Sequence, residues 1–186
     1  MKSISIMLVA FMVLSGCSTV MKSGSSKSEN YSKRTTGTLL DDQSIENRSY
    51  ANIANAAPEL RKSHIVVVSF NGVVLLAGQV ATSELRDLAE TTVRGIRKVR
   101  SAHNEITISG PTSMIARSND TWLTTKVKSK MIGSKEVDAN RIKVVTEDSV
   151  VYLLGLVTRD EADAAVSVAR QTYGVQKIVK VFEYIN

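Results

Sequence analysis

Two pairs of short valine-rich runs stand out along the chain, one pair in each half. Within each pair, two residues that are typical of turns separate the runs. In the first pair these are Asn71 and Gly72, and Asn-Gly between two β-prone runs is a strong signal for a hairpin. The pattern therefore predicts one antiparallel hairpin in each half. The four predicted strands are residues 65–70, 73–80, 142–146 and 150–157, with Asp148 and Ser149 at the second turn.

Apolar residues at helical spacing follow each hairpin. After the first hairpin they recur every three or four positions within residues 85–96, as expected for a helix with one buried face. After the second, a similar stripe ends at Tyr173, which is therefore expected to be buried. Thr158 and Glu161 fit a capping box at the start of this helix, and Gly174 fits its stop. The remaining predicted elements are helices at 41–55 and 120–132 and strands at 99–108 and 178–185.

The two halves align as copies of one unit. Gly78 aligns with Gly155, and Gly95 aligns with Gly174 ahead of the last strand. Ordered matches of this kind indicate an internal duplication. A glycine inside a strand usually marks close approach of another backbone, so Gly78 and Gly155 are assigned to structure.

The predicted fold class is α+β. Each copy has the order α-β-β-α-β and forms a two-layer sandwich, with two helices on a small three-stranded mixed sheet. Units of this size bury modest cores, so we expect the copies to pack together. The predicted domains are residues 39–109 and 117–186.

The start of the chain has the features of a secretory signal peptide. Lys2 is followed by an apolar run too short for the roughly 20 residues of a membrane-spanning helix. The sequence LSGC resembles a bacterial lipobox, which implies cleavage after residues 1–16 and acylation of Cys17. The alternative is an ordinary signal peptide with an incidental cysteine. Cys17 is the sole cysteine, which favours the lipoprotein.

The residues that follow Cys17 predict a flexible tether and an anchor in the outer membrane. Residues 17–38 are rich in serine, lysine and threonine and contain too little apolar surface to fold alone. In lipoprotein sorting, aspartate after the cysteine favours the inner membrane, whereas Ser18 and Thr19 follow here. We therefore expect the protein on the periplasmic face of the outer membrane.

The chain is basic. Its formal net charge is +6, and loss of Lys2 with the signal peptide leaves about +5. A basic surface suits an anionic partner such as phospholipid headgroups or nucleic acid. The expected compartment excludes nucleic acid as the partner.

The predicted helix at 120–132 carries two stripes. Leu123, Val127 and Met131 form an apolar stripe that is expected to face the sheet. Trp122 and Lys126, with Lys130 one turn later, form a second stripe about 100° around the helix. Tryptophan suits the water–lipid boundary, and lysines there can reach anionic headgroups. The alternative is that the tryptophan lies between the two copies.

The motif V-x-x-x-x-G-x-V-x-L-x-G-x-V, followed by a helix and a G-V-x-x-V strand, resembles the BON domain. The segments VVVSFNGVVLLAGQV and KVVTEDSVVYLLGLV carry the resemblance. Two such copies behind a lipobox resemble the dual BON-domain outer-membrane lipoproteins. The equivalent first helix of the first copy, DDQSIENRSYANIAN, has no tryptophan and only one basic residue, so the fold itself does not require the second stripe.

The family resemblance implies a phospholipid-binding function. It implies that the first helix of the second domain binds anionic phospholipid, chiefly phosphatidylglycerol and cardiolipin. It also implies enrichment at the division septum and support of envelope integrity, including outer-membrane protein assembly and regulation of cell-wall hydrolysis. The residues that would carry the contact are Trp122, Leu123, Lys126, Val127 and Lys130.

No pattern in the sequence indicates an enzyme. The two histidines, His64 and His103, lie beside predicted strands without metal-ligand spacing, and no G-x-S-x-G elbow or phosphate-binding glycine loop occurs. We therefore expect no catalytic site, metal or cofactor. Two other functions stay open: a protein-binding adaptor for outer-membrane protein assembly or amidase regulation, and a structural spacer in the envelope.

Overall fold

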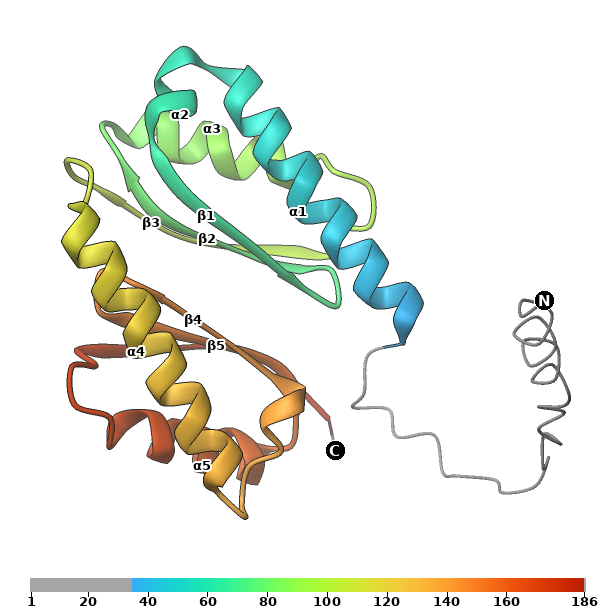
Figure 1. The fold of residues 1–186 in the computed structure, drawn as a ribbon. Coiled ribbons are helices and arrows are strands. Elements are labelled where there is room, and N and C mark those ends of the chain that lie inside the picture. Colours follow the sequence, from blue (N-terminus) through green and yellow to red (C-terminus); the bar gives the residue numbers. More distant parts are fainter. Residues whose placement is uncertain (1–34, 186) are drawn as a thin grey trace, which may run out of the picture. The chain divides into compact units, whose positions relative to one another are not determined.

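The computed structural model describes residues 35–185, which form two copies of one unit (Figure 1). The N-terminal copy contains α1 (Thr36–Ala56), α2 (Pro58–Lys62), β1 (His64–Phe70), β2 (Val73–Val80), α3 (Ser83–Arg94) and β3 (Ser101–Ile108). The C-terminal copy contains α4 (Met114–Gly133), the 3-10 helix η1 (Ala139–Arg141), β4 (Ile142–Glu147), β5 (Val150–Val157), α5 (Arg159–Arg170) and β6 (Lys177–Tyr184). The predicted signal peptide, residues 1–16, and Cys17 lie outside the described residues.

Each copy contains a three-stranded mixed sheet, and the predicted α+β sandwich is confirmed. The strand orders are β1-β2-β3 and β4-β5-β6, in which the first pair is antiparallel and the second pair parallel. Both hairpin turns have positive φ at their two central residues: 53° and 75° at Asn71 and Gly72, and 50° and 62° at Asp148 and Ser149. This is the type I′ turn, whose twist matches that of the flanking strands.

The first helix of each copy is longer than predicted. The side chain of Thr35 caps α1, which begins at Thr36, inside the range 17–38 assigned to the tether. In the C-terminal copy α4 begins at Met114, ahead of the predicted boundary at residue 117. The short elements α2 and η1 were not predicted, because a single turn has no periodic pattern.

The start of α5 was predicted correctly and its end was not. Thr158 and Glu161 form the expected capping box, in which each side chain accepts the backbone N–H of the other residue. The prediction that Gly174 stops the helix was wrong, because α5 ends at Arg170. Gly174 lies in the following turn with φ 103°.

The structure also corrects the alignment of the two copies after their hairpins. Lys98, and not Gly95, occupies the place of Gly174, because it has the positive φ, 75°. Gly95 caps α3 with φ −75°, so the two glycines share a residue type and differ in conformation. The strand registers support the corrected alignment. Val73 pairs with Ser101 and Val150 pairs with Lys177, which are the third residues after Lys98 and Gly174.

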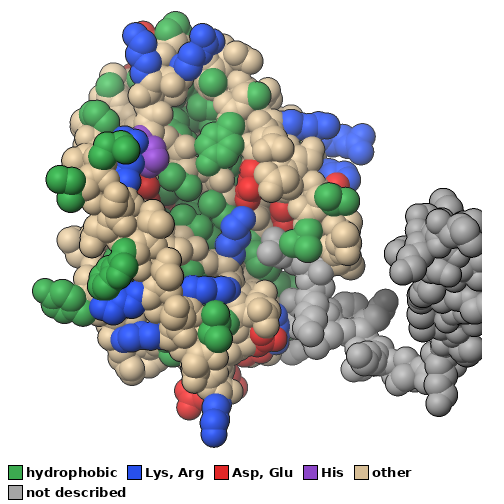
Figure 2. Space-filling view, in the orientation of Figure 1, with side chains coloured by type: hydrophobic (Ala, Val, Ile, Leu, Met, Phe, Trp, Pro, Cys, Tyr) green, Lys and Arg blue, Asp and Glu red, His purple; other side chains and the backbone are tan. Residues whose placement is uncertain are grey.

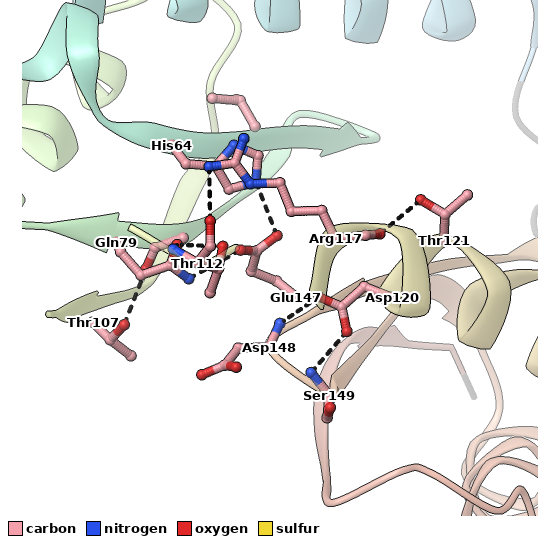
Figure 3. Close-up of polar contacts among 12 residues, drawn as sticks. His64, Gln79, Thr107, Thr112, Arg117, Asp120, Thr121, Glu147, Asp148 and Ser149 are labelled. Atoms are coloured by element: carbon pink, nitrogen blue, oxygen red, sulfur yellow. Dashed lines mark hydrogen bonds and ion pairs between the residues drawn. The ribbon is translucent and has the colours of Figure 1, made fainter. Parts of the chain in front are cut away.

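A buried aspartate joins the first helix of each copy to the hairpin. Asp42 accepts the backbone N–H groups of both central residues of the first turn, each at 2.9 Å. Asp120 does the same for Asp148 and Ser149, also at 2.9 Å each (Figure 3). Hydrogen bonds to a carboxylate are stronger than neutral ones, so each helix is held in one position over its turn.

From this aspartate, the buried positions of both helices follow at the same spacing. The buried residues are Asp42, Ile45, Ser49 and Ile53 in α1, and Asp120, Leu123, Val127 and Met131 in α4. The aspartate therefore fixes which face of each helix packs on the sheet.

Each sheet is covered on both faces. One face packs on the helices of its own copy, and the other packs on the sheet of the other copy. Burial on both sides explains why β2 begins with a continuous apolar run, residues 73–77, rather than an alternating one. The prediction that the copies pack together is confirmed. The shared cluster consists of Val68, Phe70, Val73, Leu75, Ala77, Tyr152, Leu154 and Val181.

Polar contacts surround this shared apolar cluster. The buried carboxylate of Glu147 accepts a hydrogen bond from Gln79 at 2.9 Å and lies 3.2 Å from the ring of His64 (Figure 3). Glu183 pairs with Arg100 at 2.6 Å. The two copies are thus joined by directed polar bonds as well as by apolar packing.

The two strand glycines have the structural role expected of them. A Cβ atom on Gly78 would lie 2.1 Å from the carbonyl oxygen of His64, and φ at this glycine is 124°. At Gly155 a Cβ atom would lie 2.7 Å from the carbonyl oxygen of Arg141. In both copies a neighbouring backbone carbonyl comes too close for any side chain.

We predict that Gly78→Ala lowers the free energy of unfolding by about 2–4 kcal/mol, because the methyl group clashes with fixed backbone at a φ that L residues avoid. Urea denaturation followed by circular dichroism measures the change. The matched control is Gly133→Ala, where nothing lies within 4 Å of the added methyl group. Its effect should stay below about 1 kcal/mol, and equal losses in the two variants would contradict this role for Gly78.

Candidate functional site

The two stripes of α4 face opposite environments. Leu123, Val127 and Met131 are each 0% exposed, whereas Trp122 is 55% exposed. The tryptophan is not part of the cluster between the two copies, so the alternative interpretation that placed it there is wrong. Because the two stripes are offset by one residue, the apolar stripe faces the core and the tryptophan stripe faces the surface.

Two predicted contact residues are corrected by this burial. Leu123 and Val127 were assigned to the lipid contact through the family resemblance. Both side chains are wholly enclosed between α4 and the rest of the C-terminal copy, because they follow Asp120 at core spacing. They hold the helix in place and present no surface to a partner.

The structure adds Tyr173 to the candidate site, although the sequence pattern predicted that this residue is buried. Tyr173 was expected to continue the buried stripe of α5, but it lies beyond the end of that helix and is 87% exposed. The Nζ atom of Lys126 lies 4.4 Å from the ring centroid of Trp122 and 5.9 Å from that of Tyr173. We call Trp122, Lys126 and Tyr173 the aromatic–lysine patch.

The turn that carries Tyr173 is fixed against α4. Lys130 donates to the carbonyl oxygen of Gln171 at 2.7 Å. A Cβ atom on Gly174 would lie 3.5 Å from Leu123, so this turn rests on the buried leucine. Leu123 and Lys130 therefore position the second aromatic ring, although Leu123 lies in the core.

The patch continues toward the start of α4. Ile115 is 83% exposed and precedes Trp122 by seven residues, which on a helix places it on the same face roughly 10 Å away. Hydrophobic and basic side chains gather side by side over α4 in the space-filling view (Figure 2). A third lysine of the helix, Lys128, donates instead to the carbonyl oxygens of Ala139 and Ile142.

The N-terminal copy has polar residues at the corresponding places. Ser44 follows Asp42 as Trp122 follows Asp120, and Arg48 corresponds to Lys126. Arg97 corresponds to Tyr173, because each is the third residue after its helix ends. Both copies have buried residues at equivalent helix positions and the same anchoring aspartate. The aromatic rings, which only the C-terminal copy has at these places, are therefore not needed to build the fold.

The histidines do not form a metal site. His64 contacts Glu147 between the copies, and His103 lies exposed on β3. Among residues 35–185, no three His, Cys, Asp or Glu side chains are grouped so that they could hold a metal ion. Within the same residues, no helix is both long and apolar enough to cross a membrane.

Comparison with known proteins agrees with this architecture. Residues 41–110 and 119–186 each match the BON domain. The chain is 37% identical to the outer membrane lipoprotein DolP of Haemophilus influenzae, over 100% of this chain and 97% of the relative. It is 38% identical to the 21 kDa hemolysin of Actinobacillus pleuropneumoniae, over 82% of this chain and 79% of the relative.

A more distant relative has the same kind of similarity. The osmotically-inducible protein Y of Escherichia coli K12 is 26% identical to this chain, over 76% of this chain and 72% of the relative. With two matched BON domains and similarity over its full length to the outer membrane lipoprotein DolP, the chain belongs to the BON domain family and, within it, to the DolP-type proteins.

Proposed function

We propose that the protein is an outer-membrane lipoprotein that binds anionic phospholipid through the aromatic–lysine patch of its C-terminal BON domain. The observation that carries the proposal is that the Lys126 ammonium group lies near two exposed aromatic rings, 4.4 Å from the centroid of Trp122 and 5.9 Å from that of Tyr173. An aromatic ring is favoured at the boundary of a bilayer, where its apolar body leaves water and its polar group stays hydrated.

Charge supplies the preference for anionic headgroups. A lysine near an anionic membrane surface contributes roughly 1 kcal/mol, and Lys126 lies beside the rings that would enter the interface. Lys130, on the next turn, adds a second charge while its bond to Gln171 holds Tyr173 in place. Phosphatidylglycerol and cardiolipin are the lipids that this chemistry and the family resemblance favour.

The anchor and the patch have different tasks in this proposal. Acyl chains on Cys17 hold the protein at the periplasmic face of the outer membrane. Reversible binding through the patch then enriches the protein where anionic lipid concentrates, including the division site. Support of envelope integrity follows from that placement. Imaging of tagged protein beside a Trp122→Glu variant tests the enrichment, which an unchanged distribution would disprove.

Trp122→Glu should weaken binding to vesicles containing phosphatidylglycerol by at least about tenfold, because it removes an inserted ring and adds repulsion from the lipid. Co-sedimentation of residues 18–186 with vesicles measures this without using the lost fluorophore. The matched control is Ser44→Glu, which adds the same charge at the corresponding place in the N-terminal copy. Binding that both variants weaken equally would refute a site on α4.

Tyr173→Ala should weaken the same binding about fivefold, which corresponds to about 1 kcal/mol of lost apolar burial. The control is Tyr184→Ala, because this exposed tyrosine also contacts a cation, Arg159, and lies on β6 outside the patch. Pure phosphatidylcholine vesicles should bind neither variant nor the parent protein, and added salt should weaken the anionic binding. Equal effects of the two tyrosine variants would exclude a special role for Tyr173.

A further inference from the structure

A second surface of the C-terminal copy has no role in the proposed lipid contact. A groove of about 350 Å³ lies between α5 and β6. Its apolar lining residues are Val166, Val175 and Ile178, and its basic ones are Arg170, Lys177 and Lys180. No carboxylate of residues 35–185 lines this space, which we call the β6 groove.

The strand beside this groove is an edge strand. β6 pairs with β5 on one side, and within residues 35–185 no strand pairs with its other side. An edge strand presents unpaired N–H and C=O groups, to which another extended chain can bond. Proteins normally cover or block such edges.

The N-terminal copy blocks the same edge with its own side chains. Arg94 of α3 donates to the carbonyl oxygen of Ala102 on β3 at 3.0 Å. The side-chain oxygen of Asn104 accepts the backbone N–H of Ile106 at 3.2 Å. Two backbone groups of β3 are thereby bonded without a neighbouring strand.

One carboxylate, that of Glu90, holds both blocking side chains in place. It pairs with Arg94 at 2.7 Å and accepts a hydrogen bond from Asn104 at 3.0 Å. The pKa of Glu90 is lowered, first by the hydrogen bond from Asn104 and then by that from Arg94. The closed edge of β3 therefore depends on an acid that is held ionised.

The corrected alignment shows how the C-terminal copy differs. α3 and α5 both have 12 residues and end at Arg94 and Arg170, so Glu90 corresponds to Val166. Asn104 pairs with Leu76 as Lys180 pairs with Leu153, so Asn104 corresponds to Lys180. Because Val166 stands where the N-terminal copy has Glu90, Arg170 has no ion pair like the one that holds Arg94.

The result is an open and basic edge. Arg170, Lys177 and Lys180 are exposed, and none of the three is bonded to another side chain within the described residues. The C=O group of Ile178 and the N–H group of Phe182 correspond to the bonded groups of Ala102 and Ile106. No side chain of the described part of the chain bonds to either of them. Three cations around an apolar floor are complementary to an extended segment with alternating acidic and apolar residues.

We propose that the β6 groove binds an extended acidic segment of a partner protein, which adds to the sheet as a strand beside β6. A second copy of this chain is a poor occupant, because antiparallel pairing of β6 with β6 about its middle would set the two Lys180 side chains opposite one another. A lipid headgroup offers no backbone donors and acceptors to an edge strand. The proposal is independent of the aromatic–lysine patch, since no patch residue lines the groove.

The test uses full-length ¹⁵N-labelled protein in nonionic detergent and a nine-residue peptide that alternates glutamate with valine. We expect amide shifts concentrated in β6 and α5, saturating with peptide, and at least tenfold weaker binding of a counterpart with lysine in place of glutamate. Trp122→Glu should leave the peptide affinity unchanged, which separates this site from the lipid contact.

Exchange of residues between the copies gives the decisive variants. Val166→Glu with Lys180→Asn rebuilds the blocked edge of the N-terminal copy and should weaken peptide binding at least tenfold. Glu90→Val with Asn104→Lys opens the edge of β3 and should create binding there. Dispersed amide spectra establish that each variant is folded, and Lys177→Ser with Lys180→Asn is a milder test of the charges should the first pair unfold the protein.

Three results would overturn the proposal. The first is the absence of shifts in β6 at millimolar peptide, or equal shifts with the lysine counterpart. The second is reproduction of the same shifts by inorganic phosphate or phosphatidylglycerol micelles, which would make the groove an anion site. The third is concentration-dependent broadening of β6 without peptide, which would assign the edge to pairing between copies of this chain.

Discussion

The hydrogen bonds between the Asp120 carboxylate and the hairpin amides are the interaction on which the proposed lipid-binding surface depends. They set the rotation of α4 over its sheet, so that Leu123 and Val127 enter the core and Trp122 faces outward. The buried leucine in turn supports the turn that carries Tyr173. The ring and the ammonium group of the proposed lipid contact are therefore positioned by contacts that lie inside the fold.

Comparison of the two copies separates the features that the fold requires from those that occur only in the C-terminal copy. The anchoring aspartate, the type I′ turns and the strand glycines occur in both copies, and each has a structural cause. Two surfaces of the C-terminal copy, the aromatic–lysine patch and the β6 groove, differ in chemistry from their counterparts in the N-terminal copy. In the N-terminal copy Ser44, Arg48 and Arg97 stand at the places of the patch, and the ion pair between Arg94 and Glu90 lies at the edge of β3. The N-terminal copy thus closes the sheet edge that the C-terminal copy leaves open.

The sequence predicted those elements whose causes are local. Asn71 with Gly72 specified a hairpin, and apolar spacing separated Leu123 from Trp122. Features that depend on tertiary contacts were missed. Tyr173 fits a helical stripe, but α5 ends before it, and Lys98 adopts a left-handed conformation that its residue type does not reveal. The change from Glu90 to Val166 became visible only when the strand registers aligned the copies.

The central claim is that the Trp122 ring enters the headgroup boundary of an anionic bilayer, and depth-dependent quenching tests it most directly. Trp122 is the only tryptophan, so its emission reports one position. In vesicles containing phosphatidylglycerol, we expect strongest quenching by lipids brominated near the headgroup end of their acyl chains, and shielding from aqueous iodide. Emission that no brominated lipid quenches, with iodide access unchanged from buffer, would contradict the account.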